Sequence, residues 1–72
     1  MTLLDAKIGE ARVVASVGID DAETKAFLFT LGCYDGQSVT VISKKKSTMV
    51  VAFKDARYTI DNELARTIVI KE

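Results

Sequence analysis

Apolar and polar residues alternate along most of the chain, at the period of a β-strand that buries one face. The strands predicted from this alternation are residues 11–17, 37–43, 49–54, 58–60 and 67–71. The residues predicted to share their inward face include Ala11, Val13, Ala15, Val17, Val39, Val41, Met49, Val51 and Phe53. Most of the predicted structure is therefore β-sheet.

Residues 20–31 are the exception, because their apolar positions follow the helical spacing i, i+3, i+4, i+7. The residues on this predicted buried stripe are Thr24, Phe27, Leu28 and Leu31. Asp20 fits the N-cap and Glu23 the third helical position, which is the spacing of a capping box. Asp20, Asp21 and Glu23 are also potential metal ligands. Capping explains them better, because the chain has no histidine and no second ligand cluster lies nearby in sequence.

Phe27, Leu28 and Phe29 are consecutive, and consecutive helical residues point about 100° apart. They cannot all face one core, and Leu28 is expected at its centre. Phe29 shares its side of the helix with Lys25 and two alanines, and two interpretations of its ring stay open. Either the N-terminal segment covers it within the monomer, or it is an exposed anchor for a partner. The N-terminal residues available as a cover are Leu3, Leu4 and Ile8.

Residues 31–36 join the predicted helix to the next strand. Gly32 falls where helices commonly end in a left-handed residue, and Gly36 supplies a second reversal that favours a positive φ. Cys33 is expected to pack back against Leu28 as a small buried hydrophobe. A reactive thiol is the alternative, although the chain has no histidine to activate it.

Five short strands with one helix inserted after the first predict a mainly β fold, a small and strongly curved antiparallel barrel. Closure protects the edges of the sheet and encloses a core with few residues. An open sheet packed on one helix is the alternative. Residues 61–65 should add a single helical turn capped by Asp61. The 72 residues are expected to form one domain, spanning 1–72.

Lys44, Lys45 and Lys46 connect two of the predicted strands. They form either a solvated hairpin tip or a docking point for an acidic protein surface or an anionic membrane. The whole chain has 10 basic and 10 acidic residues and a formal net charge of +0. Such a balance argues against general nucleic-acid binding, which needs a net positive surface.

The composition also excludes several chemistries. Without histidine the chain has no Ser-His-Asp or Cys-His arrangement, and no phosphate-binding glycine loop occurs, so an enzyme is not expected. No cofactor and no metal ligand set are predicted. No apolar run approaches the roughly 20 residues of a membrane span, and the first residues do not resemble a signal peptide. We therefore expect a soluble, cytoplasmic protein that does not insert into the membrane.

Residues 28–41, LFTLGCYDGQSVTV, resemble the helix-to-strand signature of the FeoA family of ferrous iron transport proteins. That signature has Leu-Gly-Leu or Leu-Gly-Met, a variable residue, Pro-Gly and a strand of alternating valines. Here Asp35 stands in place of the proline and Cys33 in place of the large residue after the glycine. The residues that the resemblance identifies as the structural motif are Leu28, Leu31, Gly32, Cys33 and Gly36.

The resemblance implies an SH3-like β-barrel and the role of a cytoplasmic accessory protein in bacterial ferrous iron uptake. The implied partner is the membrane GTPase and permease FeoB, which the protein would regulate by binding; self-association also stays open. The residues predicted to bind a partner are Lys25, Phe29, Lys44, Lys45 and Lys46.

Two other classes of function stay open. A metal-responsive sensor would need Cys33, Asp20 and Glu23 to converge in space. An RNA-binding small barrel would use Lys54 and Arg57 together with the lysine run.

Overall fold

All five predicted strands are present in the computed structural model, which describes residues 1–71. The strands are β1 (Ala11–Val17), β2 (Ser38–Lys44), β3 (Thr48–Phe53), β4 (Ala56–Asp61) and β5 (Ile68–Ile70). Every neighbouring pair is antiparallel, in the order β4-β3-β2-β1-β5. The helical elements are α1 (Ala22–Leu31), α2 (Asn62–Ala65) and the 3₁₀ turn η1 (Leu3–Asp5). Of these, only η1 was not predicted from the sequence pattern.

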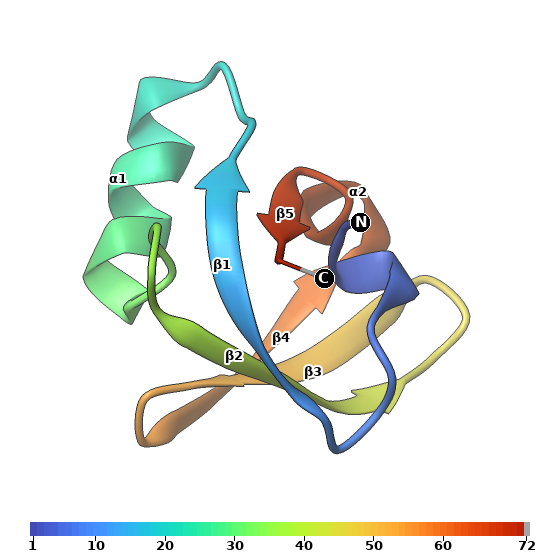
Figure 1. The fold of residues 1–72 in the computed structure, drawn as a ribbon. Coiled ribbons are helices and arrows are strands. Elements are labelled where there is room, and N and C mark those ends of the chain that lie inside the picture. The colour runs from blue at the N-terminus through green and yellow to red at the C-terminus, as the bar shows by residue number, and fades with distance from the viewer. Residues whose placement is uncertain (72) are drawn as a thin grey trace.

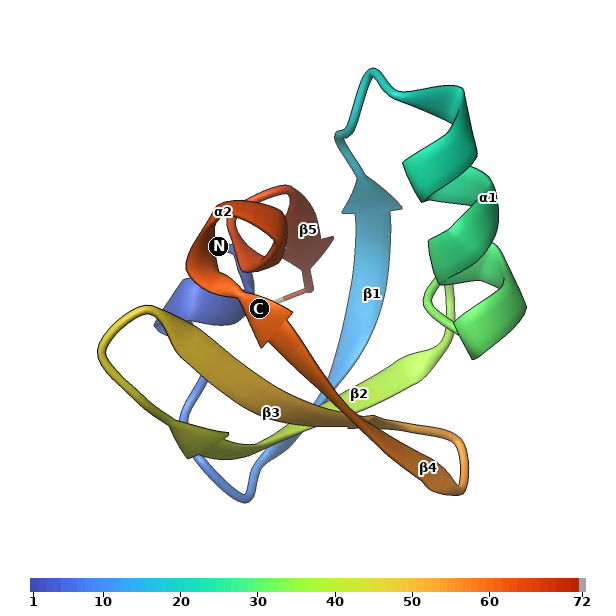
Figure 2. The same ribbon diagram turned by 180° about the vertical axis from the view of Figure 1, so that it is seen from behind.

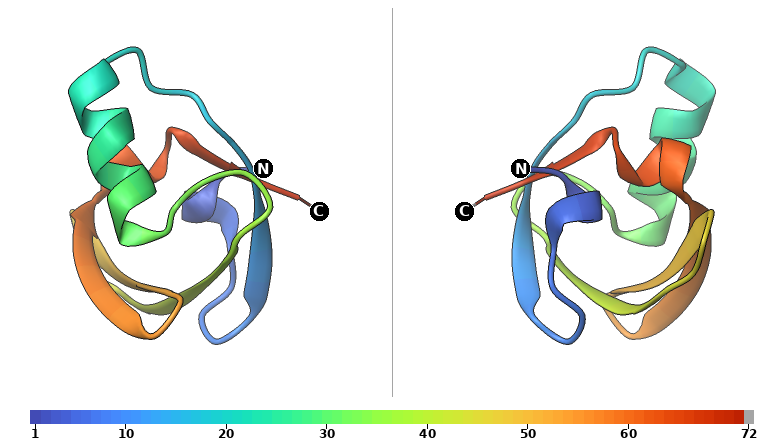
Figure 3. Two further views of the ribbon diagram at one scale, coloured as in Figure 1. Left: turned by 90° about the vertical axis from the view of Figure 1, so that its left-hand side faces the viewer. Right: turned by 90° about the vertical axis from the view of Figure 1, so that its right-hand side faces the viewer.

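The sheet curls into a small barrel, as predicted (Figure 1), and within residues 1–71 no ladder joins its edge strands β4 and β5. β2, β3 and β4 form one wall, and β1 pairs with both β2 and β5. α1 lies on one side of the barrel, and η1, α2 and the turn between β2 and β3 lie on the other (Figure 2). Seen from the side, the strands surround one interior, and α1 lies over its open part (Figure 3).

Apolar side chains from every element fill this interior, and Phe53 is the largest that is fully buried. The alternation in β2 and β3 predicted the inward face correctly, because Val39, Val41, Met49, Val51 and Phe53 are all buried. Within residues 1–71 no polar or charged side chain is buried in this core. The fold is therefore held mainly by apolar burial and by the backbone ladders of the sheet.

The predicted inward face of β1 is partly wrong. Val14 and Val17 are buried, whereas Ala11 and Val13 are exposed. The first half of β1 pairs with β2 and the second half with β5, and the pairing with β5 shifts between Val14 and Ser16. Such a bulge inserts one residue into the alternation, so residues three apart come to face the same side.

The predicted capping box of Asp20 and Glu23 is also wrong, because α1 is capped by the next residue, Asp21. Asp21 Oδ1 accepts the backbone N–H of Glu23 at 3.0 Å, and Asp21 Oδ2 accepts the Thr24 hydroxyl at 2.8 Å. These bonds, that from Thr24 foremost, lower the pKa of Asp21 below its ordinary value. Of the three carboxylates at this helix start, Asp21 is the one whose side chain caps the helix. At α2 the predicted cap is confirmed: Asp61 Oδ1 accepts the Leu64 N–H at 2.8 Å.

Candidate functional site

The junction between α1 and β2 has the conformation that its glycines predict. Gly32 caps α1 with a φ of 102°, and its N–H donates to the Phe29 carbonyl at 3.0 Å. Gly36 has a φ of 89°. Leu28 and Cys33 are buried in the common core, and the Cys33 N–H donates to the Leu28 carbonyl at 2.9 Å. Leu31 is also partly buried against this core, so Leu28, Leu31 and Cys33 all pack into it, whereas Gly36 is exposed in the turn that follows.

Phe29 is not covered by the N-terminal segment. Its side chain is 63% exposed, Leu3 is buried in the barrel core, and Ile8 is itself 57% exposed. One face of the Phe29 ring stacks on Tyr34, with the ring centroids 4.6 Å apart and the planes 29° apart. The interpretation that placed Phe29 under an internal cover is therefore wrong, and the ring is exposed to solvent with one face against Tyr34.

Phe27 is 59% exposed, so the prediction that it belongs to the buried stripe of α1 is wrong. Leu28 is the only fully buried residue of α1, and Leu31 is partly buried. The contact between α1 and the barrel is narrow, because this short helix packs on the core through Leu28 and Leu31 only. Both sequence neighbours of Leu28 therefore remain exposed. Since these neighbours lie about 200° apart on the helix, Phe27 and Phe29 occupy different flanks.

Lys54 completes the surface around Phe29, which we call the aromatic flank: Lys25, Phe29, Tyr34 and Lys54. Lys54 stands in the two-residue turn between β3 and β4 with a φ of 56°, a left-handed conformation that is uncommon for a residue with a side chain. Its stem crosses Gly32, where a Cβ would lie only 3.2 Å from the Lys54 Cδ and Cε atoms. Its Nζ lies 5.6 Å from the centroid of the Tyr34 ring, within range of a cation–π contact.

The sequence pattern missed the roles of Tyr34 and Lys54. Nothing in their local sequence indicates the contact, because it depends on the β3–β4 turn folding next to the end of α1. Lys25 is exposed one helical turn before Phe29, on the same side of α1.

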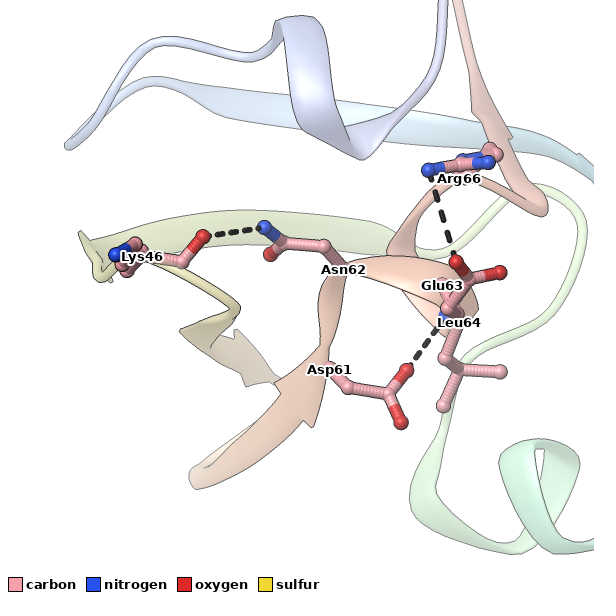
Figure 4. Close-up of polar contacts among 6 residues, drawn as sticks. All are labelled: Lys46, Asp61, Asn62, Glu63, Leu64 and Arg66. Carbon is pink, nitrogen blue, oxygen red and sulfur yellow. Dashed lines mark hydrogen bonds and ion pairs between the residues drawn. The ribbon is translucent and has the colours of Figure 1, made fainter.

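Lys44, Lys45 and Lys46 are exposed, on the side of the barrel away from α1 (Figures 1 and 2). The five residues predicted to bind a partner therefore fall on two separate surfaces. We call residues 44–47 the lysine turn. Figure 4 shows that Asn62, the first residue of α2, holds it: the Asn62 side-chain amide donates to the Lys46 carbonyl at 3.3 Å.

The metal-sensor interpretation finds no site in the described residues. No group of three or more Cys, Asp or Glu side chains within residues 1–71 is placed to hold a metal ion, so Cys33, Asp20 and Glu23 do not converge. Burial raises the pKa of the Cys33 thiol to about 11, so this thiol is neutral near pH 7. Cys33 therefore behaves as a core residue. The part of the chain that the structure describes has no pocket at its surface.

A small antiparallel barrel with one inserted helix has the fold of SH3-like domains. Within that class the chain belongs to the FeoA domain family, whose model matches residues 1–72. Comparison with curated proteins gives no match. No helix in residues 1–71 has the length and apolar character needed to cross a bilayer.

Solved structures share the fold, two FeoA proteins among them. The crystal structure of an iron uptake regulatory protein, FeoA, matches with a TM-score of 0.86 and 15% identity, over 99% of this chain and 95% of that chain. FeoA of Stenotrophomonas maltophilia in complex with zinc matches with a TM-score of 0.86 and 24% identity, over 99% of this chain and 89% of its own. The second protein is described as a prokaryotic SH3 domain protein and a candidate ferrous iron transport activating factor.

Proposed function

We propose that this protein is a cytoplasmic accessory factor of ferrous iron uptake, which regulates a FeoB-type membrane GTPase and permease by binding to it. Membership of the FeoA domain family supports the link to iron transport, as does the role suggested for the Stenotrophomonas protein. The barrel supplies a rigid support for an interaction surface. The protein would thus act on the transporter without carrying out chemistry of its own.

The exposed ring of Phe29 is the observation that carries this proposal. Large aromatic side chains exposed on a small domain are common anchors of protein interfaces, because a ring fills a pocket at low entropic cost. The stack on Tyr34 lowers that cost further, since it restricts the motion of the ring before a partner binds. Phe27 is exposed to a similar extent but has no aromatic partner among the described residues, which makes it a matched control.

The test measures binding of the intact protein to the purified permease in nanodiscs, together with the effect on GTP hydrolysis. Phe29→Ala should weaken binding by roughly 2 kcal/mol or more, about a 30-fold rise in Kd. Its stability should fall only by the roughly 0.5–1.5 kcal/mol of an aromatic pair, because the ring is mostly outside the core. Phe27→Ala should bind within about threefold of the parent. Equal losses in the two variants would argue against a specific anchor at Phe29.

A further inference from the structure

The lysine turn concentrates positive charge that the protein does not neutralise. Within residues 1–71 the ion pairs join Arg12 to Glu10 and Arg66 to Glu63, and neither involves the turn. The one hydrogen bond made by a side chain of the turn runs from Lys44 Nζ to the neutral carbonyl of Leu4, at 3.1 Å. Within these residues no carboxylate lies at ion-pairing distance from the three consecutive ammonium groups, which therefore repel one another.

The backbone of the lysine turn is nevertheless held in place by a distant element. Asn62 donates twice: its side-chain amide donates to the Lys46 carbonyl at 3.3 Å (Figure 4), and its backbone N–H donates to the Ser47 carbonyl at 2.9 Å. The Lys45 N–H also donates to the Thr48 carbonyl at 2.8 Å. A solvated hairpin tip needs no such support from α2. The fold thus fixes the position from which the lysines project.

The acidic residues closest in sequence to this support have other partners. Asp61 caps α2 through Leu64, and Glu63 lies 3.9 Å from Arg66 (Figure 4). The densest run of acidic residues, Asp20, Asp21 and Glu23, is at the start of α1, on the far side of the barrel (Figure 1). The charges of a molecule of zero net charge are therefore unevenly distributed, with three consecutive lysines on one side of the barrel and the acidic residues 20, 21 and 23 on the other.

We infer that the lysine turn is a second docking surface, which receives an acidic protein segment of the transporter and speeds association with it. The inference rests on the proposed function and adds the chemistry of the partner. A protein segment fits better than a membrane, because three lysines are fewer than the usual cluster that recognises anionic lipid. The rest of the turn and its flanks, Ser43, Ser47 and Thr48, are polar and offer no apolar side chain for insertion into a bilayer.

The decisive variant is Lys45→Glu/Lys46→Glu, which keeps the Lys44 contact with Leu4. Its control is Arg57→Glu/Lys71→Glu, which changes the net charge equally at exposed positions outside both surfaces. With the permease in nanodiscs, the turn variant should associate about tenfold more slowly at low salt and lose most of its salt dependence. The control should change the rate by about twofold or less. Asn62→Ala, which keeps every charge, should slow association by an intermediate factor.

Two further probes separate the inference from the proposed function. A synthetic oligoglutamate peptide should shift the amide resonances of residues 44–48 in the parent, and of no other lysine-bearing segment to the same extent. Vesicles containing phosphatidylserine should bind the parent no better than neutral vesicles.

Each remaining outcome overturns one of the two proposals. A parent that does not bind the permease while the peptide still shifts residues 44–48 overturns the function and leaves the docking chemistry. A parent that binds, with equal rates for the turn variant and the control, overturns the inference alone. The inference is also overturned if the peptide shifts the resonances of all lysine-bearing segments equally. It is overturned as well if the parent binds anionic vesicles selectively and the turn variant does not.

Discussion

Substitution of Gly32 by alanine tests the contact between the end of α1 and the β3–β4 turn. A φ of 102° is accessible to glycine, but a residue with a Cβ pays about 1–2 kcal/mol in the left-handed region. The new Cβ would also lie 3.2–3.3 Å from three carbons of the Lys54 stem. Displacing this flexible side chain costs little in itself, but it ends the contact with Tyr34, which at an exposed site contributes about 0.5–1 kcal/mol. The expected destabilisation is therefore about 1.5–3 kcal/mol.

Gly36→Ala is the matched control, because Gly36 has a φ of 89° and no atom lies within 4 Å of the position that a Cβ would take there. It should lose only the conformational part, about 1–2 kcal/mol. Urea unfolding of both variants, with and without Lys54→Ala, separates the two contributions, since the excess loss at Gly32 should vanish once Lys54 is truncated. Gly32→Val should be worse than Gly32→Ala, because valine is β-branched. A Gly32→Ala variant as stable as the parent would refute a left-handed Gly32.

Two predictions concern groups with shifted pKa values. Cys33→Ala should cost roughly 1 kcal/mol through lost burial, and a thiol reagent should label native Cys33 only as fast as the protein unfolds. Burial raises the thiol pKa from 9.0 to about 11, so the thiol ionises at lower pH in the unfolded chain than in the folded protein. The stability measured by urea unfolding should therefore fall between about pH 9 and pH 11. The Cys33→Ala variant should lack this decrease. The pKa of Asp21 is lowered in the folded protein, so its contribution to stability is complete above the ordinary pKa of 3.8 and should disappear as the pH falls below that value. In thermal unfolding, Asp21→Asn should therefore show a weaker dependence of stability on acid pH than the parent.

The sequence pattern predicted those parts of the fold that depend on neighbours along the chain. The inward faces of β3 and of the first part of β2 were predicted correctly, because their buried residues alternate strictly. The glycine cap of α1 and the aspartate cap of α2 are also local, since each is satisfied within one helical turn. The bounds of β1 were predicted correctly and its inward face only in part, because its bulge lies where the strand pairs with β5 as well as β2, which the local pattern does not show.

The candidate surfaces show the same division. The exposure of Phe29 was one of two open interpretations, because the sequence shows that three neighbouring apolar residues cannot all be buried but not which segment could cover them. The lysine run was visible as a charge pattern. Its attachment to Asn62 joins residues 16 positions apart, and the contact of Lys54 with Tyr34 joins two turns, so both depend on tertiary structure.

The positions of the two surfaces constrain how a single partner engages them. The protein measures 28 × 24 × 23 Å, and charges are screened over about 8–10 Å at physiological salt. Charges of a partner bound at the lysine turn therefore have little electrostatic effect at Phe29, on the opposite side of the barrel. Different parts of the partner must then contact the two surfaces. Combining Phe29→Ala with Lys45→Glu/Lys46→Glu should then change the binding free energy by the sum of the separate effects, within about 0.5 kcal/mol. A larger coupling would mean that one partner segment spans both surfaces, and that the lysine turn positions the partner as well as steering it.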